Sequence, residues 1–426
     1  MGKKRLLIRG ARVIDPANRI DRAADILIEE GKIGKIGEPR PQSLRDIEVL
    51  EAQGKIVLPG LIDMHVHLRQ PGGEAKETIL SGCEAAAAGG FTALACMPNT
   101  QPPVDSPEHV RWITSQGREA KTRVYPIAAI TKGRRGEQLS DMSRLLDAGA
   151  IAFSDDGDPV GNPQLMLSAL KMAKQLDVQL ISHAEEKALT HGGQMNEGQV
   201  AAALGLKGIP VVAEYIGVGR DIALAEYVGV RLHIAHLSTA GVVELVRQAK
   251  RRGAKITAET APHYFTLTEE QVRLSGTNAK MNPPLRTPED VAAIKEGLTD
   301  GTIDVIASDH APHTVGEKGL PFSQAPFGIV GLETALGLVL THLVAPGIIS
   351  LSEAVALMST NPARILGIKG GEIKVGQKAN LTIIDPELEW EVEVNRFKSK
   401  SRNSPFQGWR LKGRAVVTMV EERAIN

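Results

Sequence analysis

The middle of the chain alternates short β-rich runs with helical patterns, and this alternation constrains the fold more than any other feature. Runs of strand length stand at 61–65, 91–97, 123–130, 150–154, 178–182, 231–236, 255–259 and 303–308. Helical periodicity appears between many of them, at 77–89, 106–117, 162–176, 221–229 and 240–253. Strand and helix alternating over eight strands is typical of a parallel (β/α)8 barrel of the TIM type. The sequence therefore predicts an α/β chain built on such a barrel.

The two ends of the chain differ from this middle part. Residues 3–58 contain short runs of alternating apolar and polar residues, and similar runs return after Gly370. Period-2 alternation indicates strands with one buried face. A single core rarely grows beyond about 300 residues, whereas this chain has 426. We therefore predict one composite β-sandwich domain from residues 1–58 and 367–426, beside a hydrolase barrel at 59–366.

Composition and charge argue against several classes of function. Acidic and basic residues balance at 50 each, so no net field draws the chain to nucleic acid or to an anionic membrane. Aromatic residues make up only 3%, too few for a base-stacking surface. Charged residues interrupt the start MGKKRLLIRG, which therefore does not resemble a signal peptide. Cys83 and Cys96 lie in apolar stretches, which predicts free buried thiols and a cytoplasmic location.

Residue types that bind metal ions stand at the predicted carboxyl ends of five barrel strands. The first strand ends Asp63-Met64-His65-Val66-His67, where period 2 puts both imidazoles on one face. The others end Ser154-Asp155-Asp156, Ser182-His183, Ala235-His236 and Ser308-Asp309-His310. The carboxyl ends of barrel strands meet at one mouth, where such barrels build their active sites. The joint set predicts a metal centre there.

The ligand types indicate which ion this centre holds. Nitrogen and oxygen ligands without a thiolate favour zinc (Zn2+), although manganese or cobalt suits the same positions. A carboxylate that offers one oxygen to each of two ions, together with a hydroxide, would bridge a binuclear centre. Either Asp155 or Asp156 is expected to supply it. His233 precedes His236 by three residues, so we expect it to face the opposite side of its strand. His191 and His263 are assigned no role.

Three polar residues on strand-to-helix connections are candidates for holding a ligand. They are Arg69, Asn99 and Asn282. Arg69 stands two residues after His67, where a guanidinium is placed to clamp a carboxylate with two hydrogen bonds. The long connection from His310 to Gly328 contains several glycines and prolines, which predicts a hinged flap that shields the site from water.

A series of motifs resembles the class I dihydroorotases, in order and across nearly the whole chain. They are DMHVHLRQPG, CMPNT, FSDDG, SHAE, HLST, APHYF, NPPLR and SDHAPH, followed by the closing SKSRNSPFQGWRLKGRAVVT. Hydantoinases and allantoinases share only the general barrel and metal pattern, and many relatives carry a carboxylated lysine where this chain has FSDDG. The resemblance implies a zinc-dependent cyclic amidase that closes N-carbamoyl-L-aspartate to L-dihydroorotate in de novo pyrimidine (UMP) biosynthesis.

The resemblance also implies roles for particular residues, matched motif by motif. One zinc ion would be held by His65, His67, Asp156 and Asp309, and a second by Asp156, His183 and His236, with Asp156 as the bridge. The substrate would be bound by His67, Arg69, Asn99, Asn282 and His313 and by the backbone of Phe327 and Gly328.

These roles define an expected mechanism and its alternatives. A metal-bound hydroxide attacks the ring amide, and Asp309 takes its proton as general base and returns it to the amide nitrogen as general acid. The alternatives are a cyclic amidase of the hydantoinase or allantoinase type, and an inactive scaffold subunit. We expect a small-molecule substrate and a homo-oligomer, with aspartate carbamoyltransferase as a candidate partner.

Overall fold

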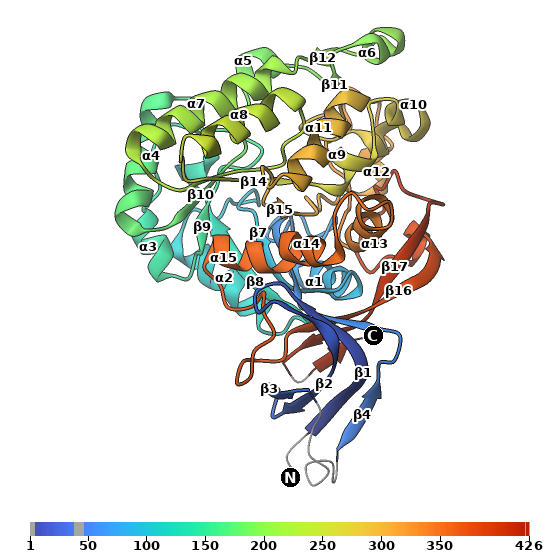
Figure 1. Ribbon diagram of the computed structural model, residues 1–426. Helices are drawn as coiled ribbons and strands as arrows, with labels where there is room; N and C mark the ends of the chain where they lie inside the picture. Colours follow the sequence, from blue (N-terminus) through green and yellow to red (C-terminus); the bar gives the residue numbers. More distant parts are fainter. Residues whose placement is uncertain (1–4, 38–46, 422, 426) are drawn as a thin grey trace.

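The computed structural model describes residues 5–37, 47–421 and 423–425, and its centre is a barrel of eight parallel strands (Figure 1). Each strand pairs with the next in the chain, and a parallel bridge between Val66 and His310 brings the first strand to the segment after the last. The strands are β6 (Leu61–Val66), β7 (Phe91–Cys96), β8 (Arg123–Ala128), β9 (Ala152–Phe153), β10 (Gln179–Ser182), β13 (Leu232–Ile234), β14 (Ile256–Thr260) and β15 (Val305–Ile306). All eight predicted strands and the TIM-type fold class are confirmed.

Helices follow the strands and surround the barrel (Figure 1). They are α1 (Ile79–Ala88), α2 (Pro107–Gly117), α3 (Met142–Asp147), α4 (Pro163–Leu176), α5 (Lys187–Thr190), α6 (Gln199–Leu204), α7 (Val212–Val228), α8 (Ala240–Arg251), α9 (Pro262–Thr266), α10 (Gln271–Ser275), α11 (Pro288–Thr299), α12 (Val315–Lys318), α13 (Ala335–Val339), α14 (Leu351–Val355) and α15 (Asn361–Leu366). Side chains that accept backbone N–H groups cap many of them, as Ser106 and Asn162 do before α2 and α4. A short parallel pair, β11 (Met195–Asn196) and β12 (Gly208–Ile209), flanks α6.

One predicted helix begins earlier than expected. Helical periodicity was predicted from residue 221, but α7 begins at Val212. Gly217 and Gly219 lower the helix propensity of this first part, which hides the pattern. Gly217 is required by packing, because a Cβ there would lie 2.7 Å from the backbone nitrogen of Glu185. Tertiary contact therefore overrides the local preference.

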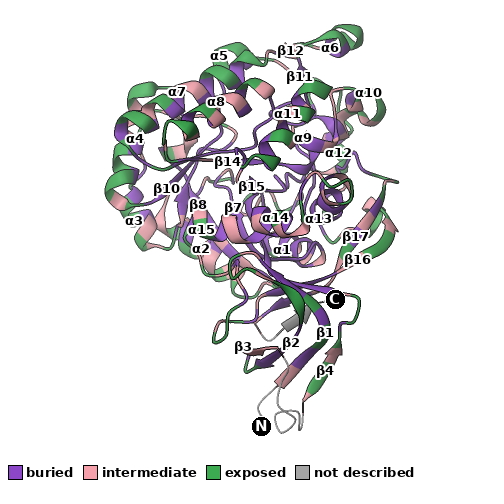
Figure 2. Ribbon diagram, viewed as in Figure 1, coloured by how far each residue is buried: buried purple, intermediate pink, exposed green. Residues whose placement is uncertain are grey.

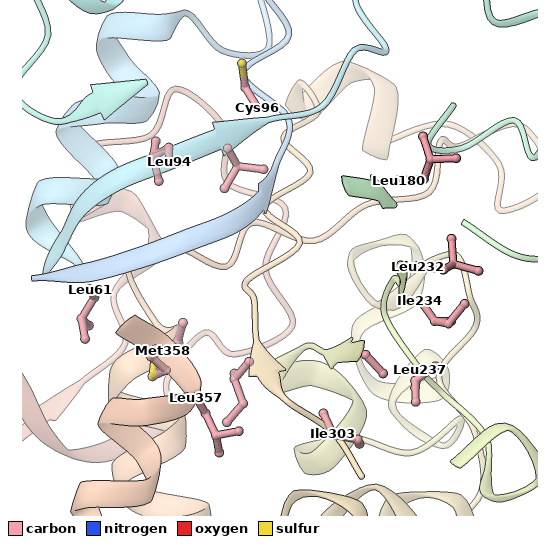
Figure 3. Packing of buried hydrophobic residues seen from close by; sticks show 14 of the residues in the cluster. Leu61, Leu94, Cys96, Leu180, Leu232, Ile234, Leu237, Ile303, Leu357 and Met358 are labelled. Carbon is pink, nitrogen blue, oxygen red and sulfur yellow. The ribbon is translucent and has the colours of Figure 1, made fainter. Parts of the chain in front are cut away.

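Successive residues of the barrel strands face two different cores. Leu94, Phe153, Leu180 and Ile306 belong to the cluster between the strands and the helices. Their neighbours Ala95, Ala152, Ile181 and Val305 belong to a separate cluster that fills the barrel interior. Figure 3 shows part of the first cluster, with Leu357 and Met358 beside Leu61 of β6. The interior is a packed core, so the functional site has to lie at one end of the barrel.

The second sheet joins the two ends of the chain. Its strands are β1 (Arg5–Asp15), β2 (Ile20–Glu29), β3 (Lys32–Ile36), β4 (Glu48–Glu51), β5 (Ile56–Pro59), β16 (Leu381–Glu391), β17 (Arg410–Val420) and β18 (Arg423–Ile425). β16 pairs antiparallel with β5, and one apolar cluster draws on both ends (Figure 1). The expected composite β-domain is therefore present. Its exact boundaries stay a prediction, and residues 1–4 and 38–46 of it lie outside the described part of the chain.

Burial follows the two cores (Figure 2). The barrel strands are buried, whereas the outer faces of the surrounding helices are exposed. Cys83 and Cys96 are both buried and free, as predicted. Among the described residues, no helix is both long enough and apolar enough to cross a membrane.

Candidate metal centre and active site

The barrel gathers the predicted ligands at the carboxyl ends of its strands. His65 lies in β6 and His67 just after it, while Asp156, His183, His236 and Asp309 follow β9, β10, β13 and β15. Two groups could each hold a metal ion, with ligand atoms within 4.8 Å of one another. They are His65, His67 and Asp156, and Asp156, His183 and His236. Asp156 is the member that both groups share.

The first group closes around one point beside Asp309. Nε2 of His65 lies 3.3 Å from Oδ1 of Asp156 and 3.5 Å from Oδ1 of Asp309. Nε2 of His67 lies 3.2 Å from Oδ1 of Asp309 and 3.6 Å from Oδ2 of Asp156. Two carboxylates and two imidazoles from three separate strand ends therefore converge, which is a ligand set of the kind that zinc prefers.

The second group forms on the other side of Asp156. Oδ1 of this carboxylate lies 3.4 Å from Nδ1 of His183 and 3.5 Å from Nε2 of His236. Nδ1 of His183 lies 2.7 Å from Nε2 of His236, so the two imidazole nitrogens point at the same space. Asp156 stands between the two groups.

Several buried polar atoms of this centre have no hydrogen-bond partner. Among them are Nε2 of His65, Oδ1 of Asp156 and Nδ1 of His236. Burial alone would raise the pKa of the Asp156 carboxyl, but the charge of His65 and the nearby imidazoles of His183 and His236 hold that pKa well below its usual range. Buried carboxylates are costly unless positive charge lies beside them. Protonation of the neighbouring histidines is one source of this charge, and a bound divalent ion would supply it instead. The residues present therefore fit a metal centre.

Adjacent aspartates at the end of β9 have different surroundings. Oδ1 of Asp155 accepts the backbone N–H groups of Ile130 (2.8 Å) and Thr131 (3.1 Å), and its Oδ2 accepts the Thr131 hydroxyl. Both oxygens of Asp155 are therefore used to fasten the connection after β8. Asp156 instead points its carboxylate into both ligand groups. The geometry favours Asp156 over Asp155 as the shared ligand.

Hydrogen bonds on the outer nitrogens orient the first two imidazoles. Nδ1 of His65 lies 2.5 Å from Oε1 of Glu259, and Nδ1 of His67 lies 2.8 Å from Oδ1 of Asn99. With Nδ1–H donating to its oxygen, each imidazole would present the Nε2 lone pair to a metal ion at the centre. Such partners fix the tautomer of a metal-binding histidine and raise its basicity. Asn99, predicted as a substrate residue, thus also orients His67.

Glu259 supports the first ligand group, although no sequence motif indicated it. It is buried within β14. Burial alone would raise the pKa of its carboxyl, but the charges of His65 and His233 and their hydrogen bonds hold that pKa well below its usual range. A signal was available, because Glu259 ends the seventh predicted strand as the other ligands end theirs. Its carboxylate contacts His65 of the first ligand group and belongs to neither group itself, so no ligand motif contains it.

The expected orientation of His233 is wrong. Its Nε2 lies 3.2 Å from Oε2 of Glu259 and its Nδ1 lies 2.8 Å from the Thr257 hydroxyl, so it faces the same interior as the site. The expectation assumed regular alternation up to His236. The backbone of His236 is left-handed, with φ of 35°, and this breaks the period of two. His233 is in neither ligand group of the described residues, in agreement with its predicted lack of a ligand role.

Left-handed backbone also occurs at two other site residues. Arg69 has φ of 59° and Asp309 has φ of 45°. Such conformations are unfavourable for residues with a Cβ and persist only where the surrounding structure holds them. Their presence at three residues of one site indicates that an unfavourable backbone conformation is maintained there in order to orient these side chains.

A cavity of about 800 Å3 opens above the ligand groups. Its lining includes every predicted substrate residue, namely His67, Arg69, Asn99, Asn282, His313, Phe327 and Gly328, together with Asp156, His183, His236 and Asp309. His65 lies fully buried beneath it. The other wall contains residues that were not predicted, including Glu185, Lys187 and His191. His191 was expected to have no role, but it lies in the wall of the cavity.

Arg69 stands at the wall of this cavity without a carboxylate partner. Its Nε donates to the carbonyl of Pro312 at 3.1 Å, and no carboxylate of the described residues forms an ion pair with its guanidinium. Burial lowers its pKa to about 10, partly offset by Asp309, so the group stays charged at neutral pH. A desolvated cation is costly unless an anion meets it. The cavity is thus prepared for an anionic group.

The segment predicted as a flap is folded over the cavity. Nε2 of His313 lies 2.8 Å from the carbonyl oxygen of Phe327, to which it donates, and 3.2 Å from the Arg69 guanidinium. Burial and the charge of Arg69 lower the pKa of His313 to about 2, so the imidazole is neutral. The buried ammonium of Lys318 donates to the carbonyls of Thr277 (2.8 Å) and Pro326 (2.9 Å). These contacts fasten both ends of the segment.

Comparison with known proteins agrees with this geometry. A family model described as dihydro-orotase-like matches residues 54–241, and one described as the amidohydrolase family matches residues 211–423. Dihydroorotase from Pelotomaculum thermopropionicum is 54% identical over 421 residues, which covers 99% of this chain and 98% of that protein. Dihydroorotase from Syntrophotalea carbinolica is 52% identical over 420 residues, with 98% of each chain covered.

Solved structures give the same fold. L-hydantoinase (dihydropyrimidinase) from Arthrobacter aurescens has a TM-score of 0.88 and 27% identity, covering 99% of this chain and 95% of that one. D-hydantoinase (dihydropyrimidinase) from Thermus sp. has a TM-score of 0.83 and 26% identity, covering 98% and 94%. The barrel, its second sheet and the histidines and aspartates at the strand ends define an amidohydrolase. Within that class, the chain belongs to the dihydroorotase family.

Proposed function

We propose that the chain is a class I dihydroorotase, a hydrolase of cyclic amides that interconverts N-carbamoyl-L-aspartate and L-dihydroorotate. The main support for this proposal is that one cavity contains both the metal-ligand groups and an arginine without a carboxylate partner. Its floor has a carboxylate, Asp156, shared by two metal-ligand groups, and its wall has a charged Arg69 without a carboxylate partner. A ring that presents both an amide and a carboxylate would satisfy both features.

The two ligand groups support a binuclear centre. We propose that His65, His67, Asp156 and Asp309 would hold one Zn2+ ion and that Asp156, His183 and His236 would hold a second, with Asp156 as the shared ligand. When bound, such ions polarise a ring carbonyl and lower the pKa of water toward neutrality. The lack of thiolate ligands supports zinc over softer ions, and the shared carboxylate supports a count of two.

Asp309 is placed to move the proton of the reaction. Its Oδ1 faces the first ligand group, and its left-handed backbone turns the side chain toward the cavity. Burial would raise its pKa, but His65 and His67 lower that pKa, so the carboxylate is ionised and able to accept a proton. We assign it as general base in hydrolysis and, in the same turnover, as general acid toward the leaving amide nitrogen.

The remaining residues are assigned to the substrate. Arg69, Asn99 and His313 surround the place for its carboxylate. Asn282 is close to the second ligand group, with its Nδ2 3.3 Å from His183 and its buried Oδ1 without a partner. This free acceptor and the backbone at Phe327 and Gly328 are suited to the ring amide groups, since a buried acceptor without a partner is costly until a ligand fills it.

A hydantoinase is the second candidate, because the similar solved structures are hydantoinases. Two observations argue against it. The carboxylate after β9 that joins both ligand groups is Asp156, and no lysine stands in the FSDDG segment. Arg69 would also be left unpaired by a ring without a carboxylate. An inactive scaffold is disfavoured because every ligand position is filled.

The biological setting follows from the reaction. We assign the enzyme to de novo pyrimidine biosynthesis in the cytoplasm, which is consistent with two free buried thiols. A homo-oligomer is proposed, with aspartate carbamoyltransferase as a candidate partner because it makes the substrate. Copurification of the two chains with a shared elution volume would test this partner directly.

Removal of the metal should abolish activity. Exhaustive chelation is expected to stop both hydrolysis of dihydroorotate and cyclisation of N-carbamoyl-L-aspartate, and added Zn2+ is expected to restore both, because the buried carboxylates lose the cations that organise the centre. The measurement is activity in both directions beside metal content per chain. Full activity in metal-free protein would refute the metal centre.

Two adjacent substitutions should separate the bridge from its neighbour. Asp156→Asn is expected to lose most of the bound metal, because two cations then repel each other with one anionic ligand fewer. Asp155→Asn is the matched control and should retain the metal, since an amide can still accept the N–H groups of Ile130 and Thr131. Metal content per folded chain is the measurement. Equal metal content in the two variants would contradict the bridging role.

A further inference from the structure

The closing segment 399–403 is a feature that the proposed mechanism does not use. It lies between β16 and β17, yet it packs against the barrel, with Ser399, Ser401 and Asn403 each 2% exposed. Its sequence contains no metal ligand, and none of its residues lines the cavity. A buried polar segment in this position requires an explanation in terms of its hydrogen bonds.

The first part of the segment is anchored beside the metal centre. The Ser399 hydroxyl and the Lys400 N–H donate to the buried carboxylate of Glu77, the latter at 3.2 Å. The same carboxylate lies 3.3 Å from Nε2 of His310, the residue after Asp309. The Ser401 hydroxyl donates to the carbonyl of Lys76 at 2.7 Å. The start of the segment is therefore held in a fixed place relative to the site.

The last residue of the segment, Asn403, bonds to the backbone of the substrate pocket. Its Oδ1 accepts the N–H of His313 at 3.0 Å. Its Nδ2 donates to the carbonyls of Ala311 at 2.9 Å and Gly328 at 3.0 Å. One buried side chain thus joins the two stretches of backbone that face each other across the flap, and it uses both donors and its acceptor to do so.

These two stretches carry the groups assigned to the substrate. His313 lies against the Phe327 carbonyl, and Arg69 donates to the carbonyl of Pro312. Gly328 packs so closely that a Cβ on it would lie 2.5 Å from the carbonyl oxygen of Ala311. The separation of the two stretches therefore sets where His313, Arg69 and the Gly328 backbone stand. A backbone hydrogen bond from the Ala311 N–H to the Ile329 carbonyl (2.9 Å) joins the stretches at one point, and Asn403 joins them at His313 and Gly328.

We propose that Asn403 is a positioning residue for substrate binding, which sets the affinity and selectivity of the pocket without touching the ligand. This proposal rests on the proposed dihydroorotase function. Asn403 is suited to the task because the three backbone groups require one acceptor and two donors on one short side chain, which an amide supplies. Neither aspartate nor leucine can supply that combination. Misplacement of substrate-holding groups by about 1 Å is enough to change catalytic parameters severalfold to a hundredfold.

The test is Asn403→Leu, an apolar side chain of similar size. The KM for dihydroorotate should rise at least about tenfold, with a smaller change in kcat and an unchanged metal content, because the pocket is displaced while the metal ligands are not. The preference for dihydroorotate over dihydrouracil should shrink. The matched control is Thr418→Val. This substitution removes the hydrogen bond that the equally buried Thr418 hydroxyl in β17 donates to the carbonyl of Ala87, and neither residue lines the cavity. Its KM should stay at the wild-type value.

A second variant keeps the proposal testable if Asn403→Leu does not fold. Asp at this position keeps the acceptor for the His313 N–H but places an oxygen against the carbonyls of Ala311 and Gly328. At neutral pH the KM of Asn403→Asp for dihydroorotate should therefore exceed that of the wild type, with unchanged metal content.

The possible outcomes separate a failure of the positioning role of Asn403 from a failure of the proposed dihydroorotase function. A folded Asn403→Leu variant with wild-type KM and wild-type selectivity would overturn the positioning role, as would a folded Asn403→Asp variant with wild-type KM. A rise in KM in Thr418→Val equal to that in Asn403→Leu would also overturn it, because the effect would then be general destabilisation. If the wild type itself does not act on dihydroorotate, the proposed function fails instead.

Discussion

Exchange of Asp309 for asparagine is expected to lower kcat by at least about 10²-fold, the usual scale for loss of a positioned acid-base group. Asparagine is the closest neutral replacement, and it tolerates the left-handed backbone of this position better than most residues. The fold should therefore survive. The loss follows because the amide can neither accept the proton of the nucleophile nor return it to the leaving nitrogen. Steady-state rates in both directions provide the measurement.

Loss of metal is the alternative cause of such a defect, since Oδ1 of Asp309 also faces His65 and His67. Metal content and rate should therefore be measured on the same preparation. A low rate with full metal content supports the acid-base role. A near-wild-type rate with full metal content would remove Asp309 from proton transfer and leave it as a ligand alone.

Exchange of Arg69 for methionine is expected to reduce the discrimination between two related rings. Dihydroorotate carries a carboxylate and dihydrouracil does not, so dihydrouracil leaves the wild-type guanidinium without an anion. An unpaired partner of a buried charge pair typically costs about 2–5 kcal/mol, or a preference of about 30-fold to several thousand-fold in kcat/KM. In Arg69→Met the KM for dihydroorotate should rise and this preference should shrink, because the penalty against the uncharged ring disappears with the charge.

The conservative variant Arg69→Lys is the matched control. It keeps the positive charge but loses the planar fork, including the donor to the Pro312 carbonyl. Its selectivity should lie between those of the wild type and Arg69→Met. Both rings should be assayed on all three proteins. A wild type that hydrolyses dihydrouracil or hydantoin as readily as dihydroorotate would contradict the proposed substrate and favour the hydantoinase alternative.

The barrel and the place of the site could be predicted because they depend on local patterns. Strand-length apolar runs and helical periodicity recur with the βα order, and a parallel barrel brings all carboxyl strand ends to one mouth. The ligand candidates were visible for the same reason, since each follows directly after an apolar run. The start of α7 was missed because Gly217 and Gly219 are poor helix formers that packing requires.

The choice between neighbouring residues could not be made from local patterns. Asp155 and Asp156 are the same residue type at successive positions, and only their partners separate them: backbone N–H groups for one, two groups of imidazoles for the other. The face of His233 was also undetermined, because the left-handed backbone at His236 breaks the alternation on which the expectation relied. Backbone strain of this kind is imposed by the surrounding structure and leaves no mark in the sequence.

The barrel, the composite β-domain and the residues at the strand ends could all be inferred from the amino-acid sequence, because they follow from periodicity and from the geometry of parallel strands. The support of those residues by distant parts of the chain is visible only in the folded molecule. Glu259 orients His65 from 194 residues away, and Asn403 holds His313 from 90 residues away. Hydrogen bonds between segments so distant in the chain depend on the packing of the whole fold, so no local pattern in the sequence encodes them.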